Sequence, residues 1–96
     1  MKRRNRYAGF FAAMGGVPAG TQIVSITDAG GGSAGQCLIT TAGDHGLDGT
    51  PVINVTGNSV GDYNVEHSVE SVPTTTTLIT NVAYTSDGTG GTWVLA

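Results

Sequence analysis

From residue 21 onward, short β-branched segments alternate with breaks that contain glycine, and this pattern constrains the fold more than any other feature. Segments rich in Val, Ile and Thr fit a pleated sheet. The clearest period of two lies in segment 63–70, where every second residue falls on one face: Tyr63, Val65, His67 and Val69. The sequence therefore predicts strands over six ranges: 21–27, 36–41, 51–56, 63–70, 74–84 and 92–96.

The breaks between these segments limit the possible architectures. The glycine run at 30–35 and the segment 86–91 are typical of loops and turns, and the chain from 21 onward has no room for the helical crossovers of a parallel sheet. We expect an all-β fold, a small antiparallel β-barrel or sandwich of about six strands, with an extended or partly helical N-terminal arm. Because Gly and Thr bury little apolar area, we also expect partner subunits to contribute stability.

The charged residues divide the chain into two parts. All four cationic side chains lie at the start of the chain, at Lys2, Arg3, Arg4 and Arg6. All seven acidic residues follow, between Asp28 and Asp87. This asymmetry predicts a basic and apolar N-terminal docking arm at 1–20 and a β-domain at 21–96. Because contact with phosphate requires cationic side chains, we expect nucleic acid to bind through the arm or not at all.

The arm also carries apolar residues at helical spacing. Tyr7, Phe10, Phe11 and Met14 follow the i, i+3, i+4, i+7 pattern of one helical face. Such a face packs either on the core of its own domain or on a neighbouring subunit, and the sequence leaves both interpretations open. The residues that we expect to dock are Lys2, Arg3, Arg4, Arg6, Tyr7, Phe10 and Phe11.

A second interpretation of the first twenty residues is a secretory leader. Their charged start is followed by the weakly apolar stretch 8–17, which glycines interrupt. No stretch of the sequence approaches the roughly 18–20 apolar residues that a membrane-spanning helix needs, so we expect no membrane partner.

The residue types needed for catalysis are present, but they do not form a recognisable site. Cys37, His45 and His67 stand at intervals that match no zinc-binding spacing, and no nucleophile motif surrounds any serine. The glycine run at 30–35 lacks the Lys that completes a phosphate-binding loop. We therefore predict no enzymatic activity, no catalytic or metal-binding residues and no cofactor, and we interpret Cys37 as a packing residue.

One series of short motifs carries a resemblance to a known class of protein. His45-Gly46-Leu47 is followed by the strand segment 52–55, then by Tyr63-Asn64-Val65, the Thr-rich segment, and finally Gly90-Gly91-Thr92-Trp93. This order resembles that of small β-modules in the virion proteins of tailed phages, over residues 36 to 93. The resemblance implies a building or adhesion unit without catalysis, with His45 and Leu47 in a structural corner.

The resemblance and the charged arm together predict a capsid decoration or cement protein on the surface of a phage virion. Its partners would be the major capsid protein or other virion subunits, in many symmetric copies or as a homo-oligomer. A tail, fibre or baseplate adhesion module is the first alternative, with loops 28–35 and 57–62 in contact with a receptor. A secreted bacterial β-protein is the second.

Overall fold

The computed structural model describes residues 18–96, and this part of the chain is almost entirely β-structure. The expected all-β antiparallel fold is confirmed. Three short 3-10 turns interrupt the strands. The elements, in chain order, are η1 (Ala19–Thr21), β1 (Ile23–Asp28), η2 (Gly31–Ser33), β2 (Gln36–Thr41), β3 (Val52–Thr56), η3 (Gly61–Tyr63), β4 (Glu66–Thr74), β5 (Thr77–Ala83), β6 (Gly88–Thr89) and β7 (Thr92–Leu95).

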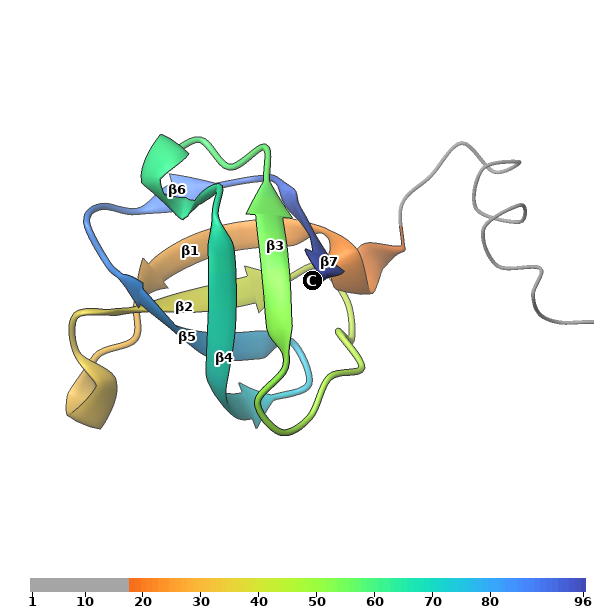
Figure 1. Cartoon of the computed structure of the whole chain (residues 1–96), viewed down its shortest axis with the longest axis horizontal. Helices are drawn as coiled ribbons and strands as arrows, with labels where there is room; N and C mark the ends of the chain where they lie inside the picture. Colours follow the sequence, from red (N-terminus) through yellow and green to blue (C-terminus); the bar gives the residue numbers. More distant parts are fainter. Residues whose placement is uncertain (1–17) are drawn as a thin grey trace, which may run out of the picture.

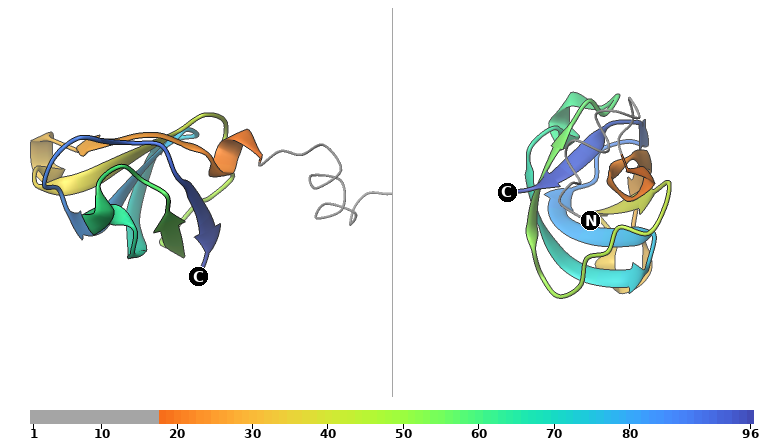
Figure 2. Two further views of the ribbon diagram at one scale, coloured as in Figure 1. Left: turned by 90° about the horizontal axis from the view of Figure 1, so that it is seen from above. Right: turned by 90° about the vertical axis from the view of Figure 1, so that its right-hand side faces the viewer.

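The seven strands form one curled antiparallel sheet in the order β6-β1-β2-β5-β4-β3-β7 (Figures 1 and 2). The two strands at its ends, β6 and β7, are consecutive pieces of the last chain segment. β6 pairs with β1, and β7 pairs with β3. A single bridge between Gln22 and Thr92 lies between these two pairings. The C-terminal segment therefore joins the two ends of the sheet.

The core lies inside the curl of the sheet. In β2, buried side chains alternate with half-buried ones, and β3 buries Ile53 and Val55 between more exposed neighbours. This alternation is the pleat of a sheet with one covered face. The buried core residues are Ile23, Ile26, Cys37, Ile39, Ile53, Val55, Tyr63, Val69, Leu78 and Trp93.

The segment predicted as a strand at 63–70 differs from the observed structure at its start. Tyr63 ends the 3-10 turn η3, and β4 begins only at Glu66. Val65 is 46% exposed, so the prediction that it shares the buried face of His67 and Val69 is wrong. Polar and apolar residues alternate in the sequence from Tyr63 onward, but the chain bends at residues 64–65 before β4 begins. The alternation therefore wrongly predicts a strand there.

The four consecutive threonines contain a turn and do not form one strand. β4 runs through Pro73 to Thr74, the chain turns at residues 75–76, and β5 returns from Thr77. Thr74 pairs with Thr77 across this hairpin, and their hydroxyl groups lie 2.7 Å apart. Beyond Ser68, β4 has no partner in β3. Pro73 therefore lies in an edge segment of the strand, where a missing N–H donor is tolerated.

The strand β6 lies where the sequence predicts only a turn. Gly88 approaches Asn58 so closely that a Cβ atom there would lie 2.3 Å from the Asn58 side-chain oxygen. Gly91 follows with φ +95°, and a Cβ atom there would lie 2.6 Å from the Thr56 carbonyl oxygen. These close approaches explain why glycine occupies position 88 in β6 and position 91 just before β7.

Trp93 fixes the start of the described chain against the last strand. Its indole N–H donates a hydrogen bond of 2.8 Å to the carbonyl oxygen of Gly20. Gly20 itself packs against the backbone of Asp44, since a Cβ atom there would lie 2.0 Å from the Asp44 carbonyl oxygen. The chain therefore enters the β-domain between β7 and the loop that follows β2.

Candidate functional site

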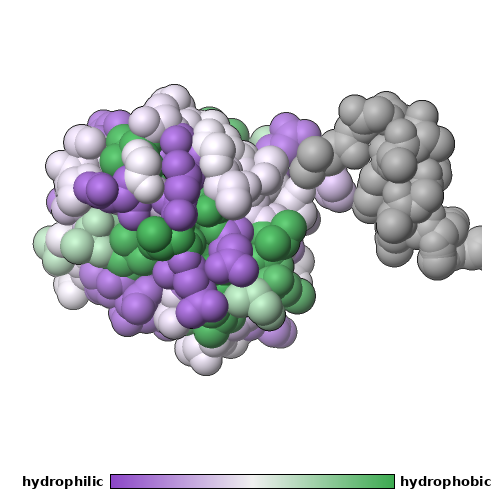
Figure 3. Space-filling model, turned by 45° about the horizontal axis from the view of Figure 1, so that its top comes forward, coloured by the Kyte–Doolittle hydropathy of each residue, from purple (hydrophilic) through white to green (hydrophobic). Residues whose placement is uncertain are grey.

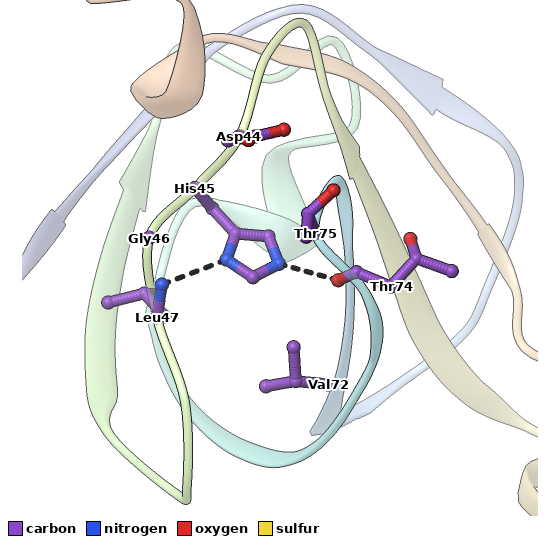
Figure 4. A pocket seen from close by; sticks show the side chains of 7 residues that line it. All are labelled: Asp44, His45, Gly46, Leu47, Val72, Thr74 and Thr75. Atoms are coloured by element: carbon purple, nitrogen blue, oxygen red, sulfur yellow. Dashed lines mark hydrogen bonds between the residues drawn. The ribbon is translucent and has the colours of Figure 1, made fainter.

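A hollow in the described surface lies beside the loop between β2 and β3. It has a volume of about 350 Å³. Figure 4 shows the His45 ring between Leu47 on one side and Thr74 and Thr75 on the other, with Val72 below the ring. The lining residues are Asp44, His45, Gly46, Leu47, Val72, Thr74 and Thr75.

Both ring nitrogens of His45 have backbone partners. Nδ1 accepts a hydrogen bond of 3.0 Å from the N–H of Leu47. Nε2 lies 2.9 Å from the carbonyl oxygen of Thr74 and 3.1 Å from that of Thr77. Since carbonyl oxygens only accept, the proton of the neutral ring is on Nε2. His45 thus connects the 45–47 corner to the β4–β5 hairpin and has no nitrogen free to act as a base.

His67 is the centre of a second, fully buried polar cluster. Its Nε2 donates to the carbonyl oxygen of Tyr63 at 2.8 Å, and its Nδ1 lies 2.8 Å from the hydroxyl group of Thr80. Burial disfavours the charged imidazolium and lowers the pKa of His67, although the bond to Tyr63 partly opposes this shift. The cluster has no exposed surface at His67 or Thr80, so it cannot contact a substrate.

Cys37 is fully buried in β2, as the packing interpretation predicts. Its thiol donates a weak hydrogen bond to the carbonyl oxygen of Ala83 at 3.7 Å. Burial raises the pKa of the thiol to about 11. Because the thiolate is the reactive form, this cysteine is a poor nucleophile at neutral pH.

The glycine run at 30–35 is closed by a carboxylate. Oδ1 of Asp28 accepts the N–H groups of Gly30 and Gly35, each at 3.0 Å. Both bonds stabilise the carboxylate and so lower the pKa of Asp28, and the bond from Gly35 has the larger effect. The two N–H groups therefore point toward a carboxylate of the same chain, and the loop is not arranged to bind a phosphate group.

Sequence reasoning missed a polar junction around Asn58, which is 6% exposed. Its side chain donates to the Gly90 carbonyl at 2.9 Å and accepts from the Val60 N–H at 2.9 Å. Its backbone exchanges two hydrogen bonds with the Asn64 side chain, at 2.8 and 3.1 Å. The sequence shows only a Gly-Asn turn here, and no local pattern indicates that Asn58 connects this turn to Asn64 and to Gly90.

The predicted docking residues, Lys2, Arg3, Arg4, Arg6, Tyr7, Phe10 and Phe11, lie outside the described residues. The described part of the chain contains all seven acidic residues, and all of them are exposed. The β-domain therefore presents a surface without cationic side chains.

Several large apolar side chains are exposed on the β-domain, and Figure 3 shows apolar surface between polar side chains on one face. Val94 on β7 is 59% exposed and stands opposite Asn54 of β3, which in turn pairs with Glu66 of β4. The outer surface of these three strands therefore combines apolar and acidic side chains. The exposed large hydrophobic residues are Val24, Val52, Val65, Val94 and Leu95.

Residues 18–96 contain no group of three or more His, Cys, Asp or Glu side chains placed to hold a metal ion. Within the same residues, no helix has the length and apolar character to span a membrane. No protein-family model matches the chain, and comparisons with curated proteins and with solved structures return no significant match.

Proposed function

We propose that this chain is a non-enzymatic structural subunit of a virion, a capsid decoration or cement protein that binds neighbouring subunits through its N-terminal arm. The observation that carries the proposal is the separation of charge. All Lys and Arg residues lie within residues 2–6. The β-domain has no Lys or Arg, and all seven of its Asp and Glu residues are exposed. A short basic segment on an acidic domain is suited to bind an anionic neighbour and to accelerate its association.

The chemistry of the β-domain supports a structural role. Its two histidines are held by hydrogen bonds to neighbouring segments, and its thiol is buried. These groups stabilise turns and the core, and none is placed to act on a bound molecule. The resemblance of residues 36–93 to phage virion modules agrees with this role.

The distribution of Lys and Arg offers a direct test with trypsin, which cleaves after these residues. In the folded protein, every possible cleavage site lies within residues 2–6. Trypsin should therefore remove the cations and leave the β-domain intact, as mass spectrometry and Trp93 fluorescence can verify. The trimmed and intact chains, freed of protease, are then mixed with particles of the source virus that lack this protein.

The proposal expects the intact chain to decorate the particle shell in electron cryo-microscopy and the trimmed chain to bind at least tenfold more weakly. A matched control is the intact chain at high salt, where screening should weaken binding in the same direction. Equal binding of trimmed and intact chains would contradict the docking role of residues 2–6. Binding to the tail alone would contradict the head location.

One observation favours the adhesion alternative. The loop that contains η2 projects from the body beyond the ends of β1 and β2 (Figure 1), and Gly31, Gly32 and Ala34 are exposed. Loop 57–62, by contrast, is tied to the body by Asn58. A receptor-binding module would therefore lose host attachment on substitution within 28–35 while it still assembled into particles.

A further inference from the structure

The pocket beside His45 is suited to an apolar side chain. Its volume of about 350 Å³ lies at the lower end of the range of about 300–1,000 Å³ for ligand pockets. Leu47 and Val72 supply apolar walls. Several polar groups at its surface already have hydrogen-bond partners. The backbone N–H of His45 donates to the Thr75 carbonyl, and the His45 ring bonds to the Leu47 N–H and the Thr74 carbonyl. Such a lining favours a hydrocarbon or aromatic group.

The described chain begins beside this pocket. Ala19 accepts a hydrogen bond of 3.2 Å from the N–H of Gly43. The next residue, Gly20, packs against the backbone of Asp44, which lines the pocket. The segment 1–17 is therefore attached to the domain at the edge of the pocket. Six residues lie between Phe11 and Pro18, and the seven steps from one to the other span up to about 24 Å when extended, so Phe11 can reach the pocket.

The composition of the segment complements the pocket. Both phenylalanines of the chain, Phe10 and Phe11, lie in it, together with all four cations. Asp44 at the pocket and Asp48 in the same loop are exposed acids that attract those cations. A tether this short also gives the segment a high effective concentration at the pocket of its own chain.

We infer that the His45 pocket binds a phenylalanine side chain, Phe10 or Phe11, of the same chain's N-terminal segment. Phenylalanine fits better than Tyr7 because several polar groups at the pocket are already bonded and a buried phenol needs a partner. The inference rests on the pocket and on the point of chain entry, and it concerns the free chain. The proposed docking on neighbouring subunits concerns the assembled particle, so the two are tested separately.

The test is methyl and aromatic NMR on the full chain. Because the chain has only two phenylalanines, phenylalanine-specific labelling reports on residues 10 and 11 alone. Nuclear Overhauser contacts are expected from the phenylalanine rings to the methyl groups of Leu47 and Val72. The exposed methyl groups of Val94 and Leu95, which do not line the pocket, serve as internal controls and should show none.

A double variant, F10A with F11A, should shift the Leu47 and Val72 methyl resonances and leave those of Val94 and Leu95 unchanged. The matched control Y7A should leave all four sets unchanged. Absence of the contacts, contacts spread equally over the control methyl groups, or shifts caused by Y7A instead would overturn the inference. One sample labelled on phenylalanine is also mixed with a second sample labelled on methyl groups. Contacts between the two labels can then arise only when the segment of one copy binds the pocket of another. Contacts in that mixture would also overturn it.

Discussion

The hydroxyl group of Tyr63 donates a hydrogen bond to the carbonyl oxygen of Ser86 and accepts one from the N–H of the same residue, at 2.5 and 3.1 Å. It also accepts the N–H of Thr85 at 2.9 Å. One phenol thus orients the backbone of two consecutive residues after β5. The Tyr63 side chain therefore contributes to the position of the segment that leads to β6.

The substitution Y63F should lower the free energy of unfolding by about 1–3 kcal/mol, because two backbone N–H groups lose their acceptor in a partly buried site. The measurement is urea denaturation followed by Trp93 fluorescence. Y84F is the matched control: the Tyr84 hydroxyl donates only to Asp87 at an exposed position, so its loss should cost less than about 0.5 kcal/mol. Equal effects of the two variants would show that the Tyr63 hydroxyl does not order residues 85–86.

Gly91 offers a second test, because its backbone has φ +95° and a Cβ atom would lie 2.6 Å from the Thr56 carbonyl oxygen. G91A should destabilise the protein by about 1–3 kcal/mol through backbone strain and displacement of β3 from β7. G32A is the control, since its surroundings within 4 Å are empty and its φ is not positive. The control should be neutral or stabilising by up to about 1 kcal/mol. A thermal melt that ranks the two variants in the opposite order would contradict this account.

Stability should decrease as the pH falls through the titration of His67. The folded-state pKa of His67 lies below its ordinary value of 6.5, so below about pH 6.5 the unfolded chain binds more protons than the folded one. The stability that the neutral ring contributes is present above that pH and is lost progressively below it. Urea midpoints between about pH 7.5 and about pH 5 should show this slope.

The variant H67Q should be less stable at neutral pH but should show a smaller slope over the same interval, because Gln does not titrate. Retention of the full slope in H67Q would assign the pH dependence to other groups.

Cys37 should resist thiol reagents in the folded state. With a pKa of about 11 and no exposed surface, the thiol has very little reactive thiolate at neutral pH. Reaction with a thiol-specific disulfide reagent should be at least about a hundredfold slower in buffer than in denaturing urea. A comparable rate in the two conditions would show that β2 opens readily.

The extent to which the fold follows from sequence depends on which interactions determine each element. β2 occupies its predicted range because its alternate residues are buried by local pleating. The turn at residues 75–76 was missed, since four identical threonines give no local contrast between strand and turn. β6 was missed because its pairing depends on the distant approach of Gly88 to Asn58, which a local pattern does not contain. For the candidate site the limit is similar: His45 acquires its role from carbonyl groups of β4 and β5, about thirty residues away in the chain.

The arrangement of β6 and β7 also affects how the protein is made in the cell. Residues 88–95 pair with β1 near the start of the domain and with β3 near its middle. During translation these residues are synthesised after all the strands with which they pair. The nascent domain therefore has both sheet ends unpaired until this segment has left the ribosome. Until then its open strand edges are exposed to other nascent chains, so synthesis rate and chaperone supply should affect the yield of folded protein.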